Sequence, residues 1–359
     1  METENKEHLK EEAIYLLKKL IATPSLSREE QQTAGIIGEF LLSKNIQCSR
    51  KGNNLWACNR HFDPLLPSIL LNSHHDTVKP NQGYTKDPFK AIIEDGRLYG
   101  LGSNDAGGCL VSLIMAFVHF YEQKLPYNLV LVASAEEEIS GKGGIESVLP
   151  ELPEIHLAIV GEPTLLQLAV AEKGLLVIDA EVRGKAGHAA RDEGENAIYK
   201  ALDDLNLIKT YRFDKKSDYL GENKVTATVI QAGSQHNVVP DLCTYTLDVR
   251  VTDAYSLEEA FEELNAVLQA DLKPRSLRLN SSRIEPSHKI LRVANNMGLK
   301  LFGSPTLSDQ ALIHYPSVKI GPGDSARSHT ADEFIYLEEI ERGVEFYIEL
   351  LTTYFDTEN

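Results

Sequence analysis

The chain has 359 residues, a hydrophobic content of 42% and a formal net charge of -17 at pH 7. This length predicts two domains rather than one, with large buried cores. Because nucleic acids and anionic membranes are themselves polyanions, the acidic balance predicts neither as a partner. No segment has the pattern of a signal peptide or is long and apolar enough to cross a bilayer, so we expect a cytoplasmic protein.

The cysteines limit the kinds of metal site that the chain can build. Cys48, Cys58, Cys109 and Cys243 are scattered, and no CxxC pair occurs. Their spacing therefore predicts neither a disulfide framework nor a thiolate zinc site. Any bound metal has to be held by histidine, aspartate and glutamate.

The N-terminal part predicts helices followed by short buried strands. An apolar stripe at helical spacing indicates a first helix through Leu9, Leu16 and Leu20. Ser27 and Glu30 have the spacing of a capping box that would begin a second helix. Residues 68–73 and 128–135 are short apolar runs typical of strands in a helix-covered α/β sheet.

The segment between these two strands predicts a buried helix. Residues 106–124, AGGCLVSLIMAFVHFYEQK, are apolar almost all round. A helix with apolar residues on every face is typical of a protein interior.

The middle of the chain has a different pattern, with alternating strands and two amphipathic helices. The predicted strands are 174–184, 223–233, 243–251 and 276–283, and the predicted helices are 194–211 and 256–272, the latter with an N-cap at Ser256. This β-α-β-β-α-β order matches a ferredoxin-like unit, which we place at 173–284. The α/β pattern then resumes at 317–323 and ends in a helix over 336–354. The expected fold is thus an α/β domain, 1–172 with 285–359, whose helix-covered mixed sheet is interrupted by an inserted ferredoxin-like domain.

Acids and histidines follow several of the predicted strands. They are His74, His75 and Asp76, Asp105 among glycines, the run Glu136 to Glu138, Glu162 in GEPT, and His329 after the last strand. Each alone has an ordinary explanation, such as a helix cap, a turn or a solvated face. Because ligands bind at the carboxyl ends of strands in open α/β sheets, their joint placement predicts one metal pocket. Carboxylates with imidazoles suit zinc, or manganese or cobalt, in a catalytic site.

Six motifs in order give the chain a family resemblance. They are HxDTV, GSxDxxGG, AxEE, GEPT, GxxxH with a later NAI, and GPGD followed by HTxDE. This set resembles the di-zinc amidohydrolases, a family that includes acetylornithine deacetylase, succinyl-diaminopimelate desuccinylase and aminoacylase. The resemblance covers nearly the whole chain, and it implies a catalytic α/β domain with an inserted lid and dimerisation domain.

The resemblance implies two zinc ions per chain and assigns their ligands. His74 and Glu162 would bind one ion, Glu138 and His329 the other, and Asp105 would bridge both. Asp76 resembles the carboxylate that orients the ligating imidazole, since the second N–H of such a ring is usually held in place. The peptide bond after Asp105 is expected to be cis.

Further residues resemble the catalytic and substrate-binding groups. Glu137 would be the general base that takes a proton from water and passes it to the leaving amine. His188, in GKAGHAARDEGENAI, resembles the lid histidine that donates to the oxyanion, from its own lid or from that of a partner. Asn237 and Arg250 resemble residues that hold substrate, with Arg250 suited to a carboxylate. The run of three glutamates leaves open whether the base and ligand are Glu137 and Glu138 or their neighbours one position earlier.

The expected activity is zinc-dependent hydrolysis of an N-acyl amino acid. Within the family the chain looks most like acetylornithine deacetylase, which makes N2-acetyl-L-ornithine the first expected substrate and arginine biosynthesis the expected pathway. Succinyl-diaminopimelate desuccinylase, or a deacylase for N-succinylornithine or N-acetylcitrulline, is the near alternative. A di- or tripeptidase and a non-catalytic metal-binding homologue are further alternatives. We expect a homodimer formed through the lid.

Overall fold

The computed structural model describes residues 2–358 and divides them into two compact units. Unit 1 comprises 2–170, Arg283–Phe302 and 308–358, and unit 2 comprises Ala171–Ser282 and Gly303–Leu307. The short segment 303–307 thus groups with unit 2, whereas the sequence pattern assigned all residues after 284 to the flanking domain. One reason is a backbone hydrogen bond in which Lys173 N donates to Ser304 O at 3.1 Å.

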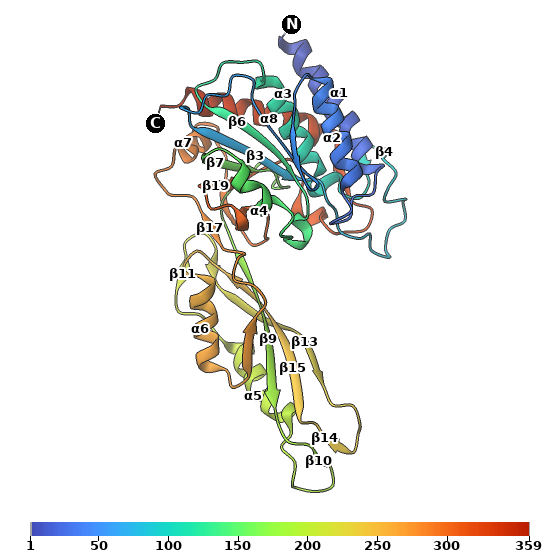
Figure 1. Cartoon of the computed structure of the whole chain (residues 1–359), viewed down its shortest axis with the longest axis vertical. Coiled ribbons are helices and arrows are strands. Elements are labelled where there is room, and N and C mark those ends of the chain that lie inside the picture. The colour runs from blue at the N-terminus through green and yellow to red at the C-terminus, as the bar shows by residue number, and fades with distance from the viewer. Residues whose placement is uncertain (1, 359) are drawn as a thin grey trace. The chain divides into compact units, whose positions relative to one another are not determined.

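Unit 1 is built on a mixed sheet (Figure 1). In spatial order its strands are β1 (Ser49–Lys51), β2 (Asn54–Cys58), β6 (Asn128–Ser134), β3 (Ser68–His74), β7 (Ile155–Val160), β19 (Ser317–Lys319), β8 (Leu168–Glu172) and β17 (Ser282–Arg283), with β18 (Leu301–Ser304) beside β8. The four central strands, β6, β3, β7 and β19, are parallel to their neighbours in this group. Their carboxyl ends therefore lie along one edge of the sheet.

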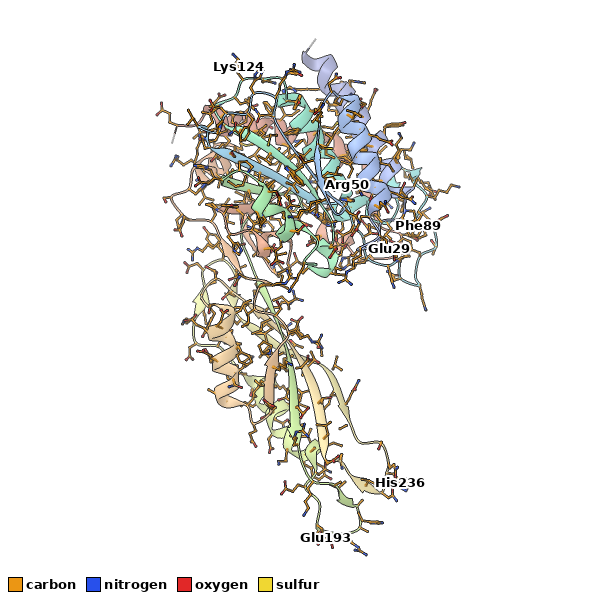
Figure 2. All side chains as sticks on the ribbon, in the orientation of Figure 1. Glu29, Arg50, Phe89, Lys124, Glu193 and His236 are labelled. Atoms are coloured by element: carbon orange, nitrogen blue, oxygen red, sulfur yellow. The ribbon has the colours of Figure 1, made fainter. Side chains whose placement is uncertain are left out.

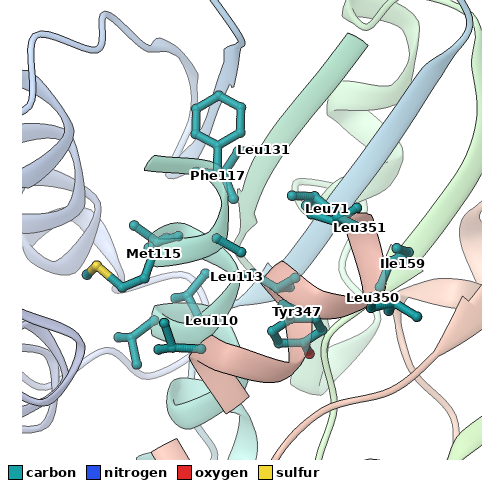
Figure 3. Packing of buried hydrophobic residues seen from close by; sticks show 14 of the residues in the cluster. Leu71, Leu110, Leu113, Met115, Phe117, Leu131, Ile159, Tyr347, Leu350 and Leu351 are labelled. Carbon is teal, nitrogen blue, oxygen red and sulfur yellow. The ribbon is translucent and has the colours of Figure 1, made fainter. Parts of the chain in front are cut away.

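Helices cover this sheet, as the buried strands predicted. They are α1 (Glu2–Ile21), α2 (Gln31–Ser43), α3 (Gly108–Phe120), α4 (Ile145–Val148), α7 (Lys289–Asn296) and α8 (Leu337–Asp356). The predicted buried helix is confirmed: α3 packs against α1, α8 and β3, and Leu110, Leu113 and Phe117 are fully buried (Figure 3). A smaller sheet pairs β4 (Ile92–Glu94), β5 (Arg97–Tyr99) and β20 (Phe334–Tyr336).

Unit 2 has the predicted ferredoxin-like order. Its sheet runs β13 (Lys224–Ala232), β15 (Leu242–Val251), β9 (Gly174–Arg183) and β16 (Asp271–Pro274), all antiparallel. The helices α5 (Ala197–Thr210) and α6 (Leu257–Val267) cover one face, where every second residue of β15 is buried. Short pairs join β10 (Gly187–His188) to β14 (Val238–Val239) and β11 (Lys216–Ser217) to β12 (Gly221–Glu222). The predicted fold class is confirmed.

The last helix and strand of unit 2 differ from the prediction. Ser256 caps α6 as expected, with the reciprocal contact from Glu259, but the helix ends at Val267 and the last strand begins at Asp271. The buried carboxylate of Asp204 accepts hydrogen bonds from the backbone N–H groups of Gln269 and Ala270. This contact holds the chain out of the helix, so a strand forms earlier than the one predicted at 276–283.

The described helices include none with both the length and the apolar character needed to cross a bilayer.

Candidate metal centre

The register of the parallel strands brings the predicted ligands together. His74 is the last residue of β3 and pairs with Ser134, the last residue of β6. The turn after β6 then places Glu137 and Glu138 next to it, in a short 3-10 helix. On the other side, Asn72 pairs with Val160 at the end of β7, so Glu162 follows two residues later at the level of His74.

Asp105 lies between the two histidines of the cluster. It stands just before α3, in the turn Ser103–Gly107. Its Oδ1 is 3.3 Å from His74 Nε2 and its Oδ2 is 3.6 Å from His329 Nε2. The two oxygens of one carboxylate thus face two different imidazoles. The Asp105–Ala106 peptide bond is cis, as expected.

One further carboxylate accompanies each histidine. Glu162 Oε1 is 3.7 Å from His74 Nε2, and Glu138 Oε2 is 2.9 Å from His329 Nε2. Two groups of three donor atoms, each within 4.8 Å of one another, could each hold an ion: His74, Asp105 and Glu138, and His74, Glu137 and Glu162.

Asp76 connects the imidazole to the glutamate turn. Its backbone carbonyl lies 3.0 Å from His74 Nδ1, and its carboxylate Oδ1 lies 3.4 Å from the same atom. The carboxylate also accepts the backbone N–H groups of Glu137 and Glu138. This fully buried side chain therefore orients the histidine and the glutamate turn together.

The adjacent His75 points elsewhere. Its Nδ1 lies 2.9 Å from Thr33 Oγ1, and its Nε2 lies 3.0 Å from the carbonyl oxygen of Asn53. Both ring nitrogens are engaged by α2 and the β1–β2 turn, so His75 has no free nitrogen for a metal.

The three consecutive glutamates have different surroundings. Glu137 Oε2 lies 3.8 Å from His74 Nε2. Glu136 has a left-handed backbone, with φ of 55°, and its carboxylate faces the glycine turn at Gly141 and Gly143 instead. The structure therefore brings Glu137 and Glu138 into the cluster and leaves Glu136 outside it.

The cluster carries more negative than positive charge. Burial raises the pKa of Glu137 well above its ordinary value, and nearby carboxylates add to this effect against the opposing influence of His74. Burial likewise raises the pKa of Glu138. The hydrogen bond with Glu138 raises the pKa of His329 to about 9. Buried carboxylates that repel one another are the expected sign of a cation site.

Two divalent ions fit this donor set. Oxygen and imidazole donors suit zinc, manganese or cobalt. Asp105 directs one oxygen to each histidine, Glu162 accompanies His74, and Glu138 accompanies His329. Glu137 lies near His74 and could also serve as a donor there.

Three residues that support the site were not predicted in this role. Buried Glu333 accepts hydrogen bonds from the backbone N–H groups of Gly102, Asn104 and Asp105, and so holds the turn that carries the shared carboxylate. It lies in the HTxDE motif, which was the available signal. Asp309 lies behind the glutamate turn and accepts hydrogen bonds from Asn72 and Ser134. No motif marks it.

The third is Ser27, whose predicted capping box is wrong. The helix α2 begins at Gln31 with Glu30 at its N-cap, so Ser27 lies three residues too early to cap it. Its hydroxyl donates instead to Asp76 Oδ2, at 2.7 Å.

The predicted lid residues lie in unit 2, at two different places: His188 and Asn237 at the β10–β14 pair, and Arg250 on the four-stranded sheet. His188 is in β10, paired with Val238 beside Asn237, and Ala189 N donates to the carbonyl oxygen of Asn237. Figure 2 labels Glu193 and His236 at this end of the unit. Arg250 is near the other end of β15, eight residues from Leu242, or about 27 Å at the usual rise of a strand. It forms a two-pronged ion pair with Asp248.

Comparison with known proteins agrees with this geometry. The model of peptidase family M20/M25/M40 matches residues 70–353. Succinyl-diaminopimelate desuccinylase of Wolbachia pipientis wMel is 24% identical, over 98% of this chain and 95% of the relative. A further desuccinylase, from the Wolbachia strain wPip of Culex pipiens, is 25% identical over 97% of this chain and 94% of its own length.

Solved structures share the fold. The M20 family metallo-carboxypeptidase Sso-CP2 of Sulfolobus solfataricus has a TM-score of 0.74 at 18% identity, with 96% of this chain and 99% of that chain covered. The YXEP protein of Bacillus subtilis, described as a dinuclear metal binding peptidase, has a TM-score of 0.75 at 18% identity, with 98% and 100% covered. The predicted resemblance is confirmed: the chain belongs to peptidase family M20/M25/M40 and is a metallohydrolase.

Proposed function

We propose that this protein hydrolyses the amide bond of an N-acyl amino acid at a two-metal site, with N2-acetyl-L-ornithine as the first candidate substrate. The observation that carries the proposal is the placement of the Asp105 carboxylate, which has one oxygen facing His74 and the other facing His329. Beside this shared carboxylate stands Glu137, which is close to His74 but not to the second histidine. His74, Glu137 and Glu162 could also hold an ion together, but in this proposal Glu137 stays off the metals and is left to activate water.

The side chains of this protein would then perform the proton transfers. When bound, two divalent ions would supply Lewis acidity toward the carbonyl oxygen and the attacking water. Glu137 takes the proton of that water and delivers it to the leaving amine. Burial raises the pKa of Glu137, and a raised pKa helps the carboxyl group to hold the proton until the amine leaves. Asp76 fixes the position of Glu137 relative to His74, because its Oδ1 contacts both His74 Nδ1 and Glu137 N.

The roles in unit 2 follow from the family resemblance. We assign His188 to the oxyanion and Asn237 and Arg250 to the substrate. Arg250 donates an Nε–H and an Nη2–H to Asp248, so a carboxylate of the substrate would meet its remaining N–H groups or replace Asp248. Since His188 is in the β10–β14 pair and Arg250 is near the far end of β15, the two need not come to one active site from the same chain.

A dimer through unit 2 would bring in a second copy of these residues. The edge strand β13 is exposed along most of its length, with Val229 and Ile230 at 49% and 53% exposure. On the adjacent α5, Tyr199 is 69% exposed and Leu202 is also exposed. An open strand edge beside exposed apolar side chains is a surface that pairing across a two-fold axis would cover.

A second candidate substrate class carries a succinyl group. Lys224 pairs directly with Arg250 across β13 and β15, and Lys173 is close enough to both for their charges to lower its pKa, after burial. A concentration of cations suits a substrate with an additional carboxylate. The sequence relatives named as desuccinylases favour the same class.

One substrate panel separates these candidates. Zinc-loaded protein is assayed for release of amine from N-acetyl-L-ornithine, N-succinyl-L-ornithine, N-succinyl-diaminopimelate, N-acetyl-L-citrulline and a tripeptide. The first candidate requires the highest kcat/KM for N-acetyl-L-ornithine. A preference for the succinyl compounds selects the second class, and cleavage of the tripeptide alone would contradict the proposed deacylase.

A further inference from the structure

A second pocket lies in unit 1, away from the metal centre. It has a volume of about 770 Å³, and Ser68 and Asn128, the first residues of β3 and β6, form part of its wall. The metal ligands are at the opposite ends of these strands. The seven residues of β3 between Ser68 and His74 correspond to about 20 Å, so the pocket does not share the reacting centre.

The floor of this pocket holds a buried lysine. Lys289, in the first turn of α7, is only 8% exposed, and its Nζ donates to Tyr127 Oη at 3.0 Å. The same ammonium lies 4.9 Å from the ring centroid of Tyr127 and 4.6 Å from that of Tyr354, and both rings line the pocket. Among the described side chains, those of residues 6–358, no carboxylate forms an ion pair with it. An ammonium has three N–H donors, so two remain after the tyrosine is satisfied.

The rest of the lining adds positive charge. Arg292 stands one helical turn after Lys289 on α7 and is the second cation of the lining. His288 also lines the pocket, but its Nδ1 accepts a hydrogen bond from Ile290 N and burial lowers its pKa, so it adds no charge. Glu154 is the single acid among the described lining residues. This local excess of cationic groups contrasts with the net charge of -17 for the chain.

The lining also has an apolar part. It includes Phe62, Leu66 and three prolines, and it continues to Leu65, which is 90% exposed. A large aliphatic side chain that is almost fully exposed beside a pocket gives a bound molecule apolar area to cover.

We propose that this pocket binds a small organic anion, with its carboxylate or phosphate on Lys289 and Arg292 and its apolar body against Phe62 and Leu65. A buried ammonium without a carboxylate is costly unless its charge is compensated, and the two tyrosine rings compensate it only in part. An anion completes the hydrogen bonding of Lys289, and the apolar part of the lining selects for an organic anion over an inorganic one. The ligand is distinct from the substrate of the metal centre.

The test uses calorimetric titration of the full-length, metal-loaded protein with phenyl phosphate. Inorganic phosphate and benzyl alcohol are titrated in parallel to separate the contributions of the charge and the apolar body. We expect phenyl phosphate to bind at least about tenfold more tightly than either. Lys289→Met should weaken its binding by about tenfold or more, because it removes a hydrogen bond between two charged groups.

Three variants complete the design. Arg292→Gln changes an exposed side chain, so it tests the charge even if replacement of the buried lysine disturbs folding. Leu65→Ser should weaken phenyl phosphate and leave inorganic phosphate unchanged. Lys300→Met removes an exposed cation outside the pocket and is the matched control, with binding as in wild type. Absence of binding by the folded wild type, or equal loss in Lys300→Met, would overturn the proposal, whatever the result of the substrate panel.

Discussion

Replacement of Asp76 by asparagine tests how the site is held together. The carboxylate has two contacts on each oxygen: Ser27 Oγ and Glu138 N on Oδ2, and Glu137 N and His74 Nδ1 on Oδ1. Asparagine keeps one acceptor oxygen, and in either orientation its NH2 group faces two of these donors. His74 Nδ1 keeps the backbone carbonyl oxygen of Asp76 as an acceptor, and the Ser27 hydroxyl can turn to accept from the NH2 group. The donor left without an acceptor is therefore the backbone N–H of Glu137 or of Glu138, and the variant should lose about 1–3 kcal/mol of stability.

The same change should weaken metal binding. Loss of a partner that orients a ligating histidine typically lowers metal affinity by about 10- to 100-fold. The affinity is measured by competition with a chromogenic chelator, and the stability by urea unfolding of the metal-free protein. Ser27→Ala removes a single contact and should lower the stability by about 1 kcal/mol. Asp95→Asn, at an exposed turn, is the control and should change neither quantity. An Asp76→Asn variant with wild-type metal affinity would refute the orienting role.

Three further predictions concern the base, the buried acid behind it and the lid. Glu137→Gln should lower kcat by about a hundredfold or more with both metals retained, as expected for loss of a general base. Glu136→Gln should keep a kcat within a few-fold of wild type. The reverse result would show that Glu136 is the base. Burial raises the pKa of Asp309 to about 6, so its folded form retains a proton that the unfolded chain releases above about 3.8, and stability falls as pH rises between these values. Asp309→Asn should remove this pH-dependent loss of stability and raise the free energy of unfolding above pH 6 by up to about 3 kcal/mol. If the variant showed the wild-type pH dependence in urea unfolding, the raised pKa would not belong to Asp309. His188→Ala should be inactive with metals bound. Mixing it with Glu137→Gln should restore activity, because a mixed dimer contains one site with both residues intact; labelled chains must first show that subunits exchange. No recovery in such mixed dimers would exclude action of His188 in the partner's site.

The clustering of the candidate ligands was predictable because several of them lie at or just after the ends of strands. Parallel strands expose their carboxyl ends at one edge, so a histidine after β3 and a glutamate after β7 come together once the register is set. The buried helix α3 and the order of unit 2 were equally visible, since apolar periodicity reports burial directly.

The supporting residues depended on contacts between distant segments. Ser27 has the right spacing for a cap, but its hydroxyl is used by Asp76, 49 positions later. Asp309 reaches Asn72 across 237 positions, and no local pattern distinguishes it from a surface acid. The end of α6 was mispredicted for the same reason, because Asp204 on another helix takes the N–H groups that follow it. Local propensity cannot report a competing partner that only the tertiary fold supplies.

The central claim, that Asp105 is shared between two ions, is tested most directly by counting metals. Protein equilibrated with excess zinc and freed of unbound ions is measured by elemental analysis, alongside Asp105→Ala. We predict close to two zinc ions per chain for the wild type and a clear loss of zinc in the variant, because the substitution removes one ligand from each ion. A firm ceiling of one zinc ion per fully active chain, or an unchanged content of two in Asp105→Ala, would contradict the shared carboxylate.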